Sequence, residues 1–123
     1  MADLFSGHVL VVEDNIIIAM DAEELVRSLG AAEVHGASSV DQAMQHLAEH
    51  PVEAAILDFN LVGETSETVA DTLVERGTPF VFATGYSGLK ELPERFRNRT
   101  LLQKPYTASE IRDAFGVATA SAA

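Results

Sequence analysis

Short apolar runs alternate along the chain with longer stretches in which apolar residues recur every three or four positions. Three of the runs are apolar at both odd and even positions, which is typical of parallel strands covered by helices on both faces. The longer stretches have the period of amphipathic helices. The pattern therefore predicts alternating strands and helices, with strands at residues 8–12, 31–36, 54–57, 79–83 and 101–103.

Residues that start or stop helices lie at the ends of the periodic stretches. Asn15 is placed to cap the first helix and Gly30 to end it. Residues 39–42 and 107–110 are capping boxes at the starts of the second and last helices, and a third helix is expected at 67–76. The inward faces of the helices are expected to carry Ile18, Ala22, Leu25, Leu29, Ala43, Leu47, Val69, Leu73, Ile111, Ala114, Phe115 and Ala118.

One connection, between the fourth and fifth strands, breaks this pattern. Residues 86–99 occupy the place of a fourth helix, but Gly85 and Gly88 weaken its start and Pro93 removes a backbone donor from its middle. Proline is tolerated at a first helical position, so a short helix near Pro93 fits the sequence. We therefore expect a short or irregular fourth helix with few apolar anchors.

Right-handed crossovers between these elements give a three-layer α/β/α fold. We expect a doubly wound, five-stranded parallel sheet in the order 2-1-3-4-5. Residues 1–123 are expected to form a single domain with its core at about 8–116. The small side chains of residues 119–123 favour a flexible, fraying C-terminal tail.

Composition narrows the classes of function. The chain has 123 residues, 47% of them hydrophobic, which suits one domain with a substantial core. It contains no cysteine, so disulfides and thiolate metal sites are excluded. The net charge of −11 argues against direct nucleic-acid binding, and no apolar run predicts a membrane span or a signal peptide. These properties indicate an acidic, cytoplasmic protein.

Candidate chemistry lies where the predicted strands end. Glu13 and Asp14 form an acidic pair after the first run, and Asp58, Thr84 and Lys104 end later ones. The carboxyl ends of parallel strands share one edge of the sheet, which is where ligands bind in such folds. Each motif alone is ordinary, because Asp favours turns and Lys is usually solvated. Their coincidence at one edge favours a functional site.

The crowded carboxylates at this edge require a compensating charge. Two like charges about 5 Å apart repel by roughly 3 kcal/mol at an effective dielectric constant near 20. A divalent cation removes that repulsion, and Mg²⁺, with Mn²⁺ as the alternative, suits carboxylate, water and phosphate oxygens. Asp58 is then a nucleophile for a phosphoryl group, whose charge Lys104 and a hydrogen bond from Thr84 would stabilise.

Two histidines suggest a second metal site. His46 and His50 lie four residues apart and are spaced to pair on a metal ion. They also lie at a helix end beside Glu49, and the sequence shows no third ligand. A solvated helix face is therefore the favoured interpretation.

The strand-end motifs together suggest a family. The segments Val-Glu-Asp-Asn at 12–15, Leu-Asp at 57–58, Ala-Thr-Gly at 83–85 and Lys-Pro at 104–105 closely resemble those of the receiver domain of bacterial two-component response regulators. The string Phe-Ala-Thr-Gly-Tyr further resembles the FAT GUY subgroup of single-domain alphaproteobacterial regulators, in which one more residue separates Gly from Tyr. The resemblance covers essentially the whole chain.

This resemblance implies a stand-alone response regulator that accepts a phosphoryl group from a sensor histidine kinase onto Asp58 and is not a turnover enzyme. It implies that Asp14 and the backbone carbonyl of Asn60 bind the metal directly and that Glu13 helps directly or through water. It also implies a cis Lys104–Pro105 bond. A further phosphotransfer or regulatory protein is a possible partner, and the expected state is a monomer or weak dimer.

Three other functions, and a DNA-binding output, each require sequence features that this chain lacks. A hydrolase that passes through an aspartyl-phosphate would want an acid at Asn60, and a degenerate receiver would usually have lost Asp58, Thr84 or Lys104. A flavin-binding domain would want a loop of small residues after the first strand, where the acidic pair repels phosphate. A DNA-binding output domain would need about a hundred further residues.

The chain departs from common receivers in the region that transmits the signal. The position three before Lys104, usually Tyr or Phe, is Leu101, so Tyr86 is the nearest aromatic expected beside Thr84. Tyr86 is either buried filler or a switch element. We expect the segment 87–96 to be mobile or only partly helical without phosphate, and to form the partner-binding surface together with Tyr86 and the helix after Thr107.

Overall fold

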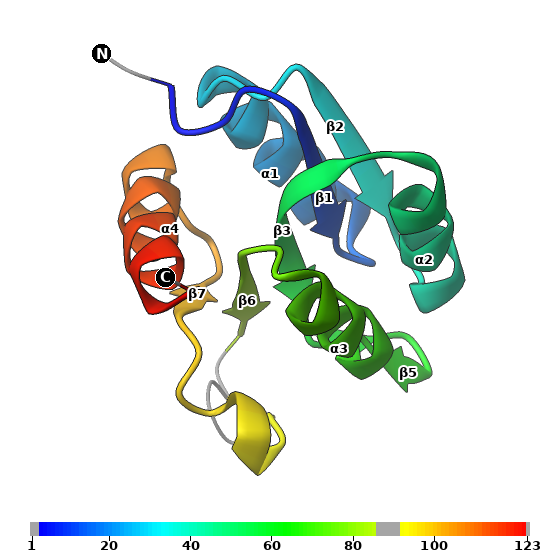
Figure 1. The fold of residues 1–123 in the computed structure, drawn as a ribbon. Helices are drawn as coiled ribbons and strands as arrows, with labels where there is room; N and C mark the ends of the chain where they lie inside the picture. The colour runs from blue at the N-terminus through cyan, green and yellow to red at the C-terminus, as the bar shows by residue number, and fades with distance from the viewer. Residues whose placement is uncertain (1–2, 86–91, 123) are drawn as a thin grey trace.

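The structure is a computed structural model that describes residues 3–85 and 92–122. A five-stranded parallel sheet forms its centre, with the strand order β2-β1-β3-β6-β7 (Figure 1). The short strands β4 and β5 form a separate hairpin, so the central strands follow the predicted order 2-1-3-4-5. The expected doubly wound α/β fold is confirmed.

The central strands are β1 His8–Val12, β2 Glu33–Ala37, β3 Val52–Asp58, β6 Phe80–Thr84 and β7 Leu101–Gln103. The α-helices are α1 Ile16–Ser28, α2 Val40–Glu49, α3 Glu67–Arg76 and α4 Ala108–Ala122. Each neighbouring pair of central strands runs parallel, so their carboxyl ends share one edge. Among the described residues, none of the helices has the length and apolar character needed to cross a bilayer.

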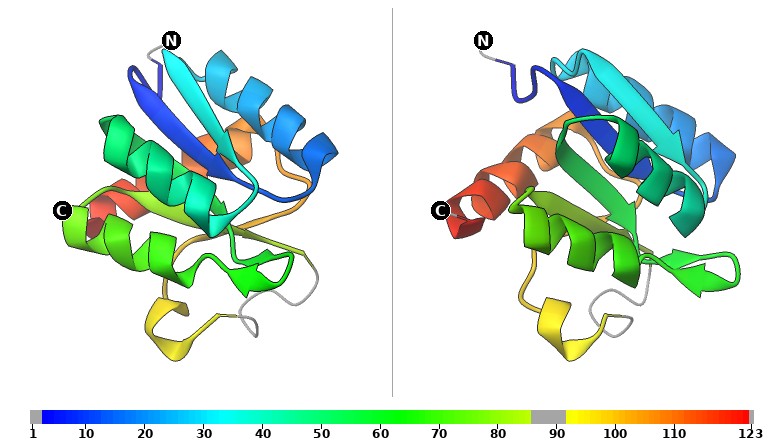
Figure 2. Two further views of the ribbon diagram at one scale, coloured as in Figure 1. Left: turned by 90° about the vertical axis from the view of Figure 1, so that its right-hand side faces the viewer. Right: turned by 45° about the vertical axis from the view of Figure 1, so that its right-hand side comes forward.

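Two layers of helices cover the sheet, one on each face (Figures 1 and 2). Helices α1 and α4 pack on one face, in a core that includes Val26 and Ile111. Helices α2 and α3 pack on the other face, where Leu47 and Leu73 share a core with Phe82. Because β1, β3 and β6 are covered on both sides, residues of both parities are buried along them, as the apolar runs predicted.

Capping residues identified in the sequence set the helix ends. The side chain of Asn15 accepts hydrogen bonds from two backbone N–H groups in the first turn of α1. Gly77 ends α3 with a φ of 68°, a left-handed conformation that favours glycine. The buried stripe of α1 differs slightly from the prediction, because Val26 is fully buried while Leu25 is only half-buried.

The described part of the crossover between β6 and β7 contains no α-helix, as predicted. Its described part holds one 3₁₀ helix, Glu94–Phe96, which begins directly after Pro93. Proline cannot donate a backbone hydrogen bond, and its fixed φ suits the position before a first turn. The predictions for Tyr86 and for residues 87–91 lie outside the described residues.

The described end of this crossover is anchored by Leu92 and Phe96, which stand at helical spacing in the sequence and were therefore able to pack inward. Leu92 and Phe96 are 1% and 3% exposed and pack into the core under α2 and α3. The Phe96 ring also meets Phe82 edge to face at 5.4 Å. Arg95 adds ion pairs to two carboxylates of α3, although exposed pairs of this kind contribute little free energy. Residues 92–96 are therefore held to the core chiefly by two apolar side chains.

Two other segments differ from the prediction. The segment after Asp58, expected as a polar loop, forms an antiparallel hairpin of β4 Asn60–Leu61 and β5 Glu64–Thr65. Gly63 has a φ of 74°, which lets the chain reverse there. Helix α4 continues to Ala122, beyond the apolar stripe predicted to end at Ala118, and alanine, which recurs in this stretch, has the highest helix propensity. The fraying of residues 119–123 stays a prediction.

Candidate functional site

Polar residues predicted at the strand ends meet at the carboxyl edge of the sheet. Glu13 and Asp14 follow β1, Asp58 closes β3, Thr84 closes β6 and Lys104 follows β7. The parallel pairing of these four strands brings their ends level with one another. The site therefore depends on tertiary structure, since its residues are separated by up to 91 positions along the chain.

Lys104 links two of the acids directly. Its ammonium nitrogen Nζ lies 2.9 Å from Oε1 of Glu13 and 3.1 Å from Oδ2 of Asp58. The Lys104 side chain is 16% exposed, and the two carboxylates are less exposed still. A backbone hydrogen bond of 2.9 Å from the Lys104 N–H to the Thr84 carbonyl fixes the start of the segment that carries it. The Lys104–Pro105 bond is cis, as expected.

Three acidic residues form a compact cluster around this lysine. Glu13, Asp14 and Asp58 each offer a carboxylate oxygen within 4.8 Å of the others. Glu13 and Asp58 are 4% and 6% exposed, whereas Asp14 is half-buried. Glu13 is also tied to the start of α1, because its Oε2 accepts a hydrogen bond from the Asn15 N–H at 3.0 Å. Hard oxygen donors at this spacing fit a Mg²⁺ ion, which binds carboxylates together with water and phosphate oxygens.

The two deepest carboxyls have pKa values that are shifted in opposite directions. Burial, and after it the negative charge of Glu13, raises the pKa of Asp58 to about 7, although Lys104 opposes the rise. Burial also acts to raise the pKa of Glu13, but hydrogen bonds from the Asn15 backbone and from Lys104 outweigh it and hold that pKa below its ordinary value. One lysine is thus shared by two carboxylates, and it offsets the burial of the negative charge less fully at Asp58 than at Glu13.

Two further predicted site residues occupy the expected elements. Thr84 is 2% exposed and ends β6, and its neighbour Ala83 pairs with Asp58 across the sheet. Asn60 begins β4, two residues beyond Asp58. The role of its backbone carbonyl as a metal ligand stays a prediction. Leu101, at the position where an aromatic is common, packs partly buried against the core under α2 and α3.

One aromatic residue beside the acids was missed in the sequence. Tyr106 is 7% exposed and packs in the core beneath α1 and α4. Burial, and then the charges of nearby carboxylates with Glu13 foremost, raises the pKa of its hydroxyl. Tyr106 lies just after the strand-end lysine and its proline, so a search confined to strand ends passes over it.

An exposed apolar face at the start of α1 was also not predicted. Ile16, Ile17 and Met20 are 70%, 72% and 62% exposed, and we call them the α1 apolar face. Large apolar side chains gathered on a surface often mark a site of protein association. This face begins two residues after Asp14, so it lies beside the acidic cluster.

The fold and the site together define a receiver-type signalling domain: an open parallel sheet with an acidic cluster, a threonine and a lysine at its carboxyl edge. The sequence matches the model of the family described as the response regulator receiver domain over residues 9–115. The chain therefore belongs to this family of two-component signalling domains, which are not turnover enzymes in the usual sense. The predicted family is confirmed.

Solved structures show the same relationship. The chain is 38% identical to SdrG from Sphingomonas melonis Fr1, with a TM-score of 0.73, covering 95% of this chain and 96% of that one. It is 27% identical to the receiver domain of PhyR from Erythrobacter litoralis, with a TM-score of 0.76, covering 94% and 92% of the two chains. In a longer PhyR structure the match, at 26% identity, covers 46% of that protein. The search of curated proteins gave no match.

Proposed function

We propose that this chain is a stand-alone response regulator, which accepts a phosphoryl group from the phosphohistidine of a sensor kinase onto Asp58 and signals by changing its protein partners. The observation that carries the proposal is the position of Lys104, 2.9 Å from Glu13 and 3.1 Å from Asp58 at the carboxyl edge of the sheet. A cation held there by two buried carboxylates is well placed to meet the oxygens of a phosphoryl group on Asp58.

The transfer needs few protein groups. An oxygen of Asp58 attacks phosphorus, the new O–P bond forms as the donor's N–P bond breaks, and the bonding electrons leave with the donor imidazole. Lys104 would move its ion pair from the Asp58 carboxylate to the incoming phosphoryl oxygens. Thr84, buried beside Asp58, would donate a hydrogen bond to another of them.

A divalent cation would supply the positive charge that three clustered carboxylates and a phosphoryl group require beyond that of Lys104. Glu13, Asp14 and Asp58 would hold Mg²⁺ together with the Asn60 carbonyl, and the bound ion would neutralise charge on both the carboxylates and the phosphoryl group. Because burial raises the pKa of Asp58 to about 7, added positive charge is what favours its ionised, nucleophilic form near neutral pH.

Similar proteins support this assignment. SdrG, which matches along 96% of its chain, was also solved in a form described as the BeF3-activated conformation. The match to that form has 38% identity and covers 89% of the present chain. Beryllofluoride is a mimic of a phosphoryl group, so a protein of similar sequence responds to one.

The α1 apolar face supplies a docking surface for the phosphodonor. The donor histidine must approach Asp58 closely enough for bond formation, so its protein must contact the rim of the acidic site. Ile16, Ile17 and Met20 lie on that rim and are 62–72% exposed. We assign them to contact an apolar surface of the kinase's phosphodonor domain, with the charged site left for the transfer itself.

Beryllofluoride binding tests this proposal. In the presence of Mg²⁺, we expect beryllofluoride to shift the amide resonances of residues at the ends of β1, β3, β6 and β7, with saturation at one equivalent. Asp58→Asn removes the oxygen that bonds to beryllium and should abolish the shifts while leaving the fold intact. Shifts of equal size in Asp58→Asn, or none in the wild type with both reagents present, would refute the proposal.

A further inference from the structure

All four histidines of the sequence gather at one place in the fold, away from the acidic site. His8 opens β1, His35 lies in the middle of β2, and His46 and His50 lie in and just after the last turn of α2. The sequence showed only the pair on α2 and no third ligand. The structure supplies two more imidazoles from the sheet, so the predicted solvated helix face is instead a half-buried cluster.

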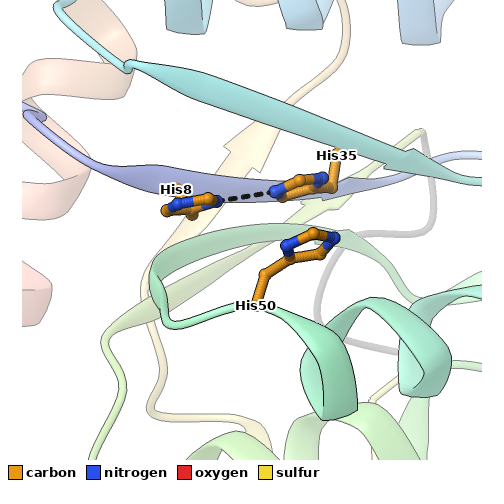
Figure 3. Close-up of side chains that lie close together, drawn as sticks. All are labelled: His8, His35 and His50. Atoms are coloured by element: carbon orange, nitrogen blue, oxygen red, sulfur yellow. Dashed lines mark hydrogen bonds between the residues drawn. The ribbon is translucent and has the colours of Figure 1, made fainter.

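Three of the rings converge closely (Figure 3). Nδ1 of His8 lies 2.8 Å from Nε2 of His35, within hydrogen-bond distance. The His35 ring stacks on His50 with their centroids 4.0 Å apart, and His8 stacks on His50 at 5.5 Å. Each of these three residues offers a ring nitrogen within 4.8 Å of the others. His8, His35 and His50 form what we call the histidine triad.

The backbone explains why the triad forms. In the parallel pairing of β1 and β2, His35 stands beside Leu10, two residues along from His8. Leu10 belongs to the core beneath α2, and alternate residues share a face, so both histidines point toward α2. His50 caps the end of that helix, with its N–H bonded to the His46 carbonyl at 2.9 Å. The positions of the three histidines are thus determined by β1, β2 and the end of α2.

His46 is held apart from the triad by its own contact. Its Nε2 lies 3.1 Å from the carbonyl oxygen of Gly36, so this nitrogen donates a hydrogen bond to the backbone of β2. Its ring centroid is 5.1 Å from that of His35 and 6.0 Å from that of His50. His46 therefore packs against the triad without offering a nitrogen to the same point.

We propose that the histidine triad is a binding site for a first-row transition-metal ion, with Zn²⁺ as the ion to test, and that water fills the remaining position. Neutral imidazole is a preferred ligand of Zn²⁺, Ni²⁺ and Cu²⁺, and three histidines suffice for a tetrahedral zinc site with one open position. Ligands about 2.05 Å from a tetrahedral ion lie about 3.3 Å from each other. The ring nitrogens already lie within 4.8 Å of one another. Because an imidazole lone pair lies in the ring plane and the three rings are stacked nearly parallel, metal binding requires the rings to rotate out of the stack and the His8–His35 hydrogen bond to break.

The surroundings favour a neutral ring at His35. Burial, followed by the charges that His50, His46 and His8 would carry, lowers the pKa of His35, while Glu33 on the same strand opposes the shift weakly. A neutral ring keeps a lone pair free for a metal. The five residues from His8 to Glu13 place the cluster about 16 Å along β1 from the acidic residues, at about 3.3 Å per residue, so the two sites differ in place as well as in ligand type.

Zinc titration of the full-length chain tests the site. Nitrogen NMR of the imidazole rings should show coordination shifts for His8, His35 and His50 at one equivalent of Zn²⁺, with His46 unchanged. Calorimetry should show that His50→Ala weakens this binding by about 100-fold or more, whereas the matched variant His46→Gln binds as the wild type does. His8→Gln should behave like His50→Ala, which guards against a single variant that misfolds.

Two results would overturn the proposal. One is zinc binding that leaves the triad resonances unmoved, because the ion would then occupy the acidic cluster. The other is an equal loss of affinity in His46→Gln and His50→Ala, which would mean that the triad is not the ligand set. Beryllofluoride binding at Asp58 should be unchanged in His50→Ala, so failure of the zinc site and failure of the proposed function remain separable.

Discussion

The acidic site and the histidine triad lie on the same sheet but resolve crowding in different ways. Glu13 and Asp58 are nearly fully buried like charges that share one lysine, and the pKa of Asp58 rises to about 7 as a result. The histidines are half-buried and carry no like-charged carboxylate pair, and Nδ1 of His8 lies within hydrogen-bond distance of Nε2 of His35. The acidic site is therefore strained until a cation or a phosphoryl group arrives, whereas the triad is stable on its own.

The largest expected effect follows from removing the shared cation. Lys104→Met leaves two buried carboxylates without their partner, and breaking a buried ion pair in this way typically costs about 3–5 kcal/mol. We expect the free energy of unfolding without divalent cations to fall by about 3 kcal/mol, since protonation of Asp58 offsets part of the cost. Urea denaturation measures this change.

The control for that variant is an exposed cation. Arg27 forms an ion pair with Glu23 at 3.7 Å on the surface of α1, with its side chain 58% exposed. Arg27→Met should change the free energy of unfolding by less than about 0.5 kcal/mol. Equal effects of the two substitutions would mean that the acidic site is not under electrostatic strain.

The next effect is a gain in stability. The pKa of Asp58 is raised from 3.8 to about 7 in the folded state, so the metal-free protein binds this proton more tightly when folded. The contribution of Asp58 to stability is therefore greatest below about pH 4, declines between about pH 4 and 7, and is constant above that range. Asp58→Asn should stabilise the metal-free protein at pH 8 by about 2 kcal/mol, and the gain should vanish toward pH 4.

Thermal or urea unfolding in a chelator at both pH values checks this prediction. Mg²⁺ should stabilise the wild type at pH 8 much more than it stabilises Asp58→Asn. A variant that is less stable than the wild type at pH 8 would show that Lys104 fully compensates both carboxylates, against the contrast drawn above.

A smaller, kinetic effect is expected at the α1 apolar face. Ile17 is 72% exposed, so Ile17→Ser should leave stability within about 0.5 kcal/mol of the wild type. It should slow phosphoryl transfer from a histidine kinase by about tenfold in kcat/KM, a typical cost of truncating an interface residue. Labelling from a small-molecule phosphodonor should be unaffected.

Val74 provides the matched comparison for Ile17, because it is an apolar side chain of α3 that is 45% exposed but outside the α1 apolar face. Val74→Ser should transfer at the wild-type rate with the kinase. If Ile17→Ser slows both donors equally, the residue acts through the acidic site and not through docking.

The smallest effect is expected at the histidine triad. In the metal-free protein, His50→Ala removes ring stacking worth about 0.5–1.5 kcal/mol and no charge pair. We expect a loss of about 1 kcal/mol in urea denaturation. A loss as large as that of Lys104→Met would contradict the view that the triad is unstrained.

The sequence predicts the acidic site well because strand ends carry it. Apolar runs locate the strands, parallel pairing aligns their ends, and the residue after each run then falls at one edge, as Asp58 and Lys104 do. The helix caps follow from equally local signals, such as Asn15 and Gly77. These features can be predicted because each depends on a single residue type at the end of a strand or helix, and those ends can be located in the sequence.

The features that the sequence did not reveal depend on which face of the sheet a side chain occupies and on the register in which strands pair. His8 and His35 meet because two strands pair in one register and both side chains face α2, which a pattern of apolar runs does not specify. The spacing of Leu92 and Phe96 allowed them to pack inward, but the 3₁₀ helix at Glu94–Phe96 is set by tertiary packing. The hairpin after Asp58 likewise arises from a turn at Gly63 within a polar stretch.

Phosphoryl transfer to Asp58 is the central claim, and intact-mass spectrometry after incubation with a phosphorylated histidine kinase and Mg²⁺ tests it most directly. We expect the wild type to gain the mass of one phosphoryl group, and the gain to disappear with a chelator or in Asp58→Asn. Base-labile label on a peptide that contains Asp58 would locate the group. Stoichiometric phosphorylation of Asp58→Asn would contradict the account.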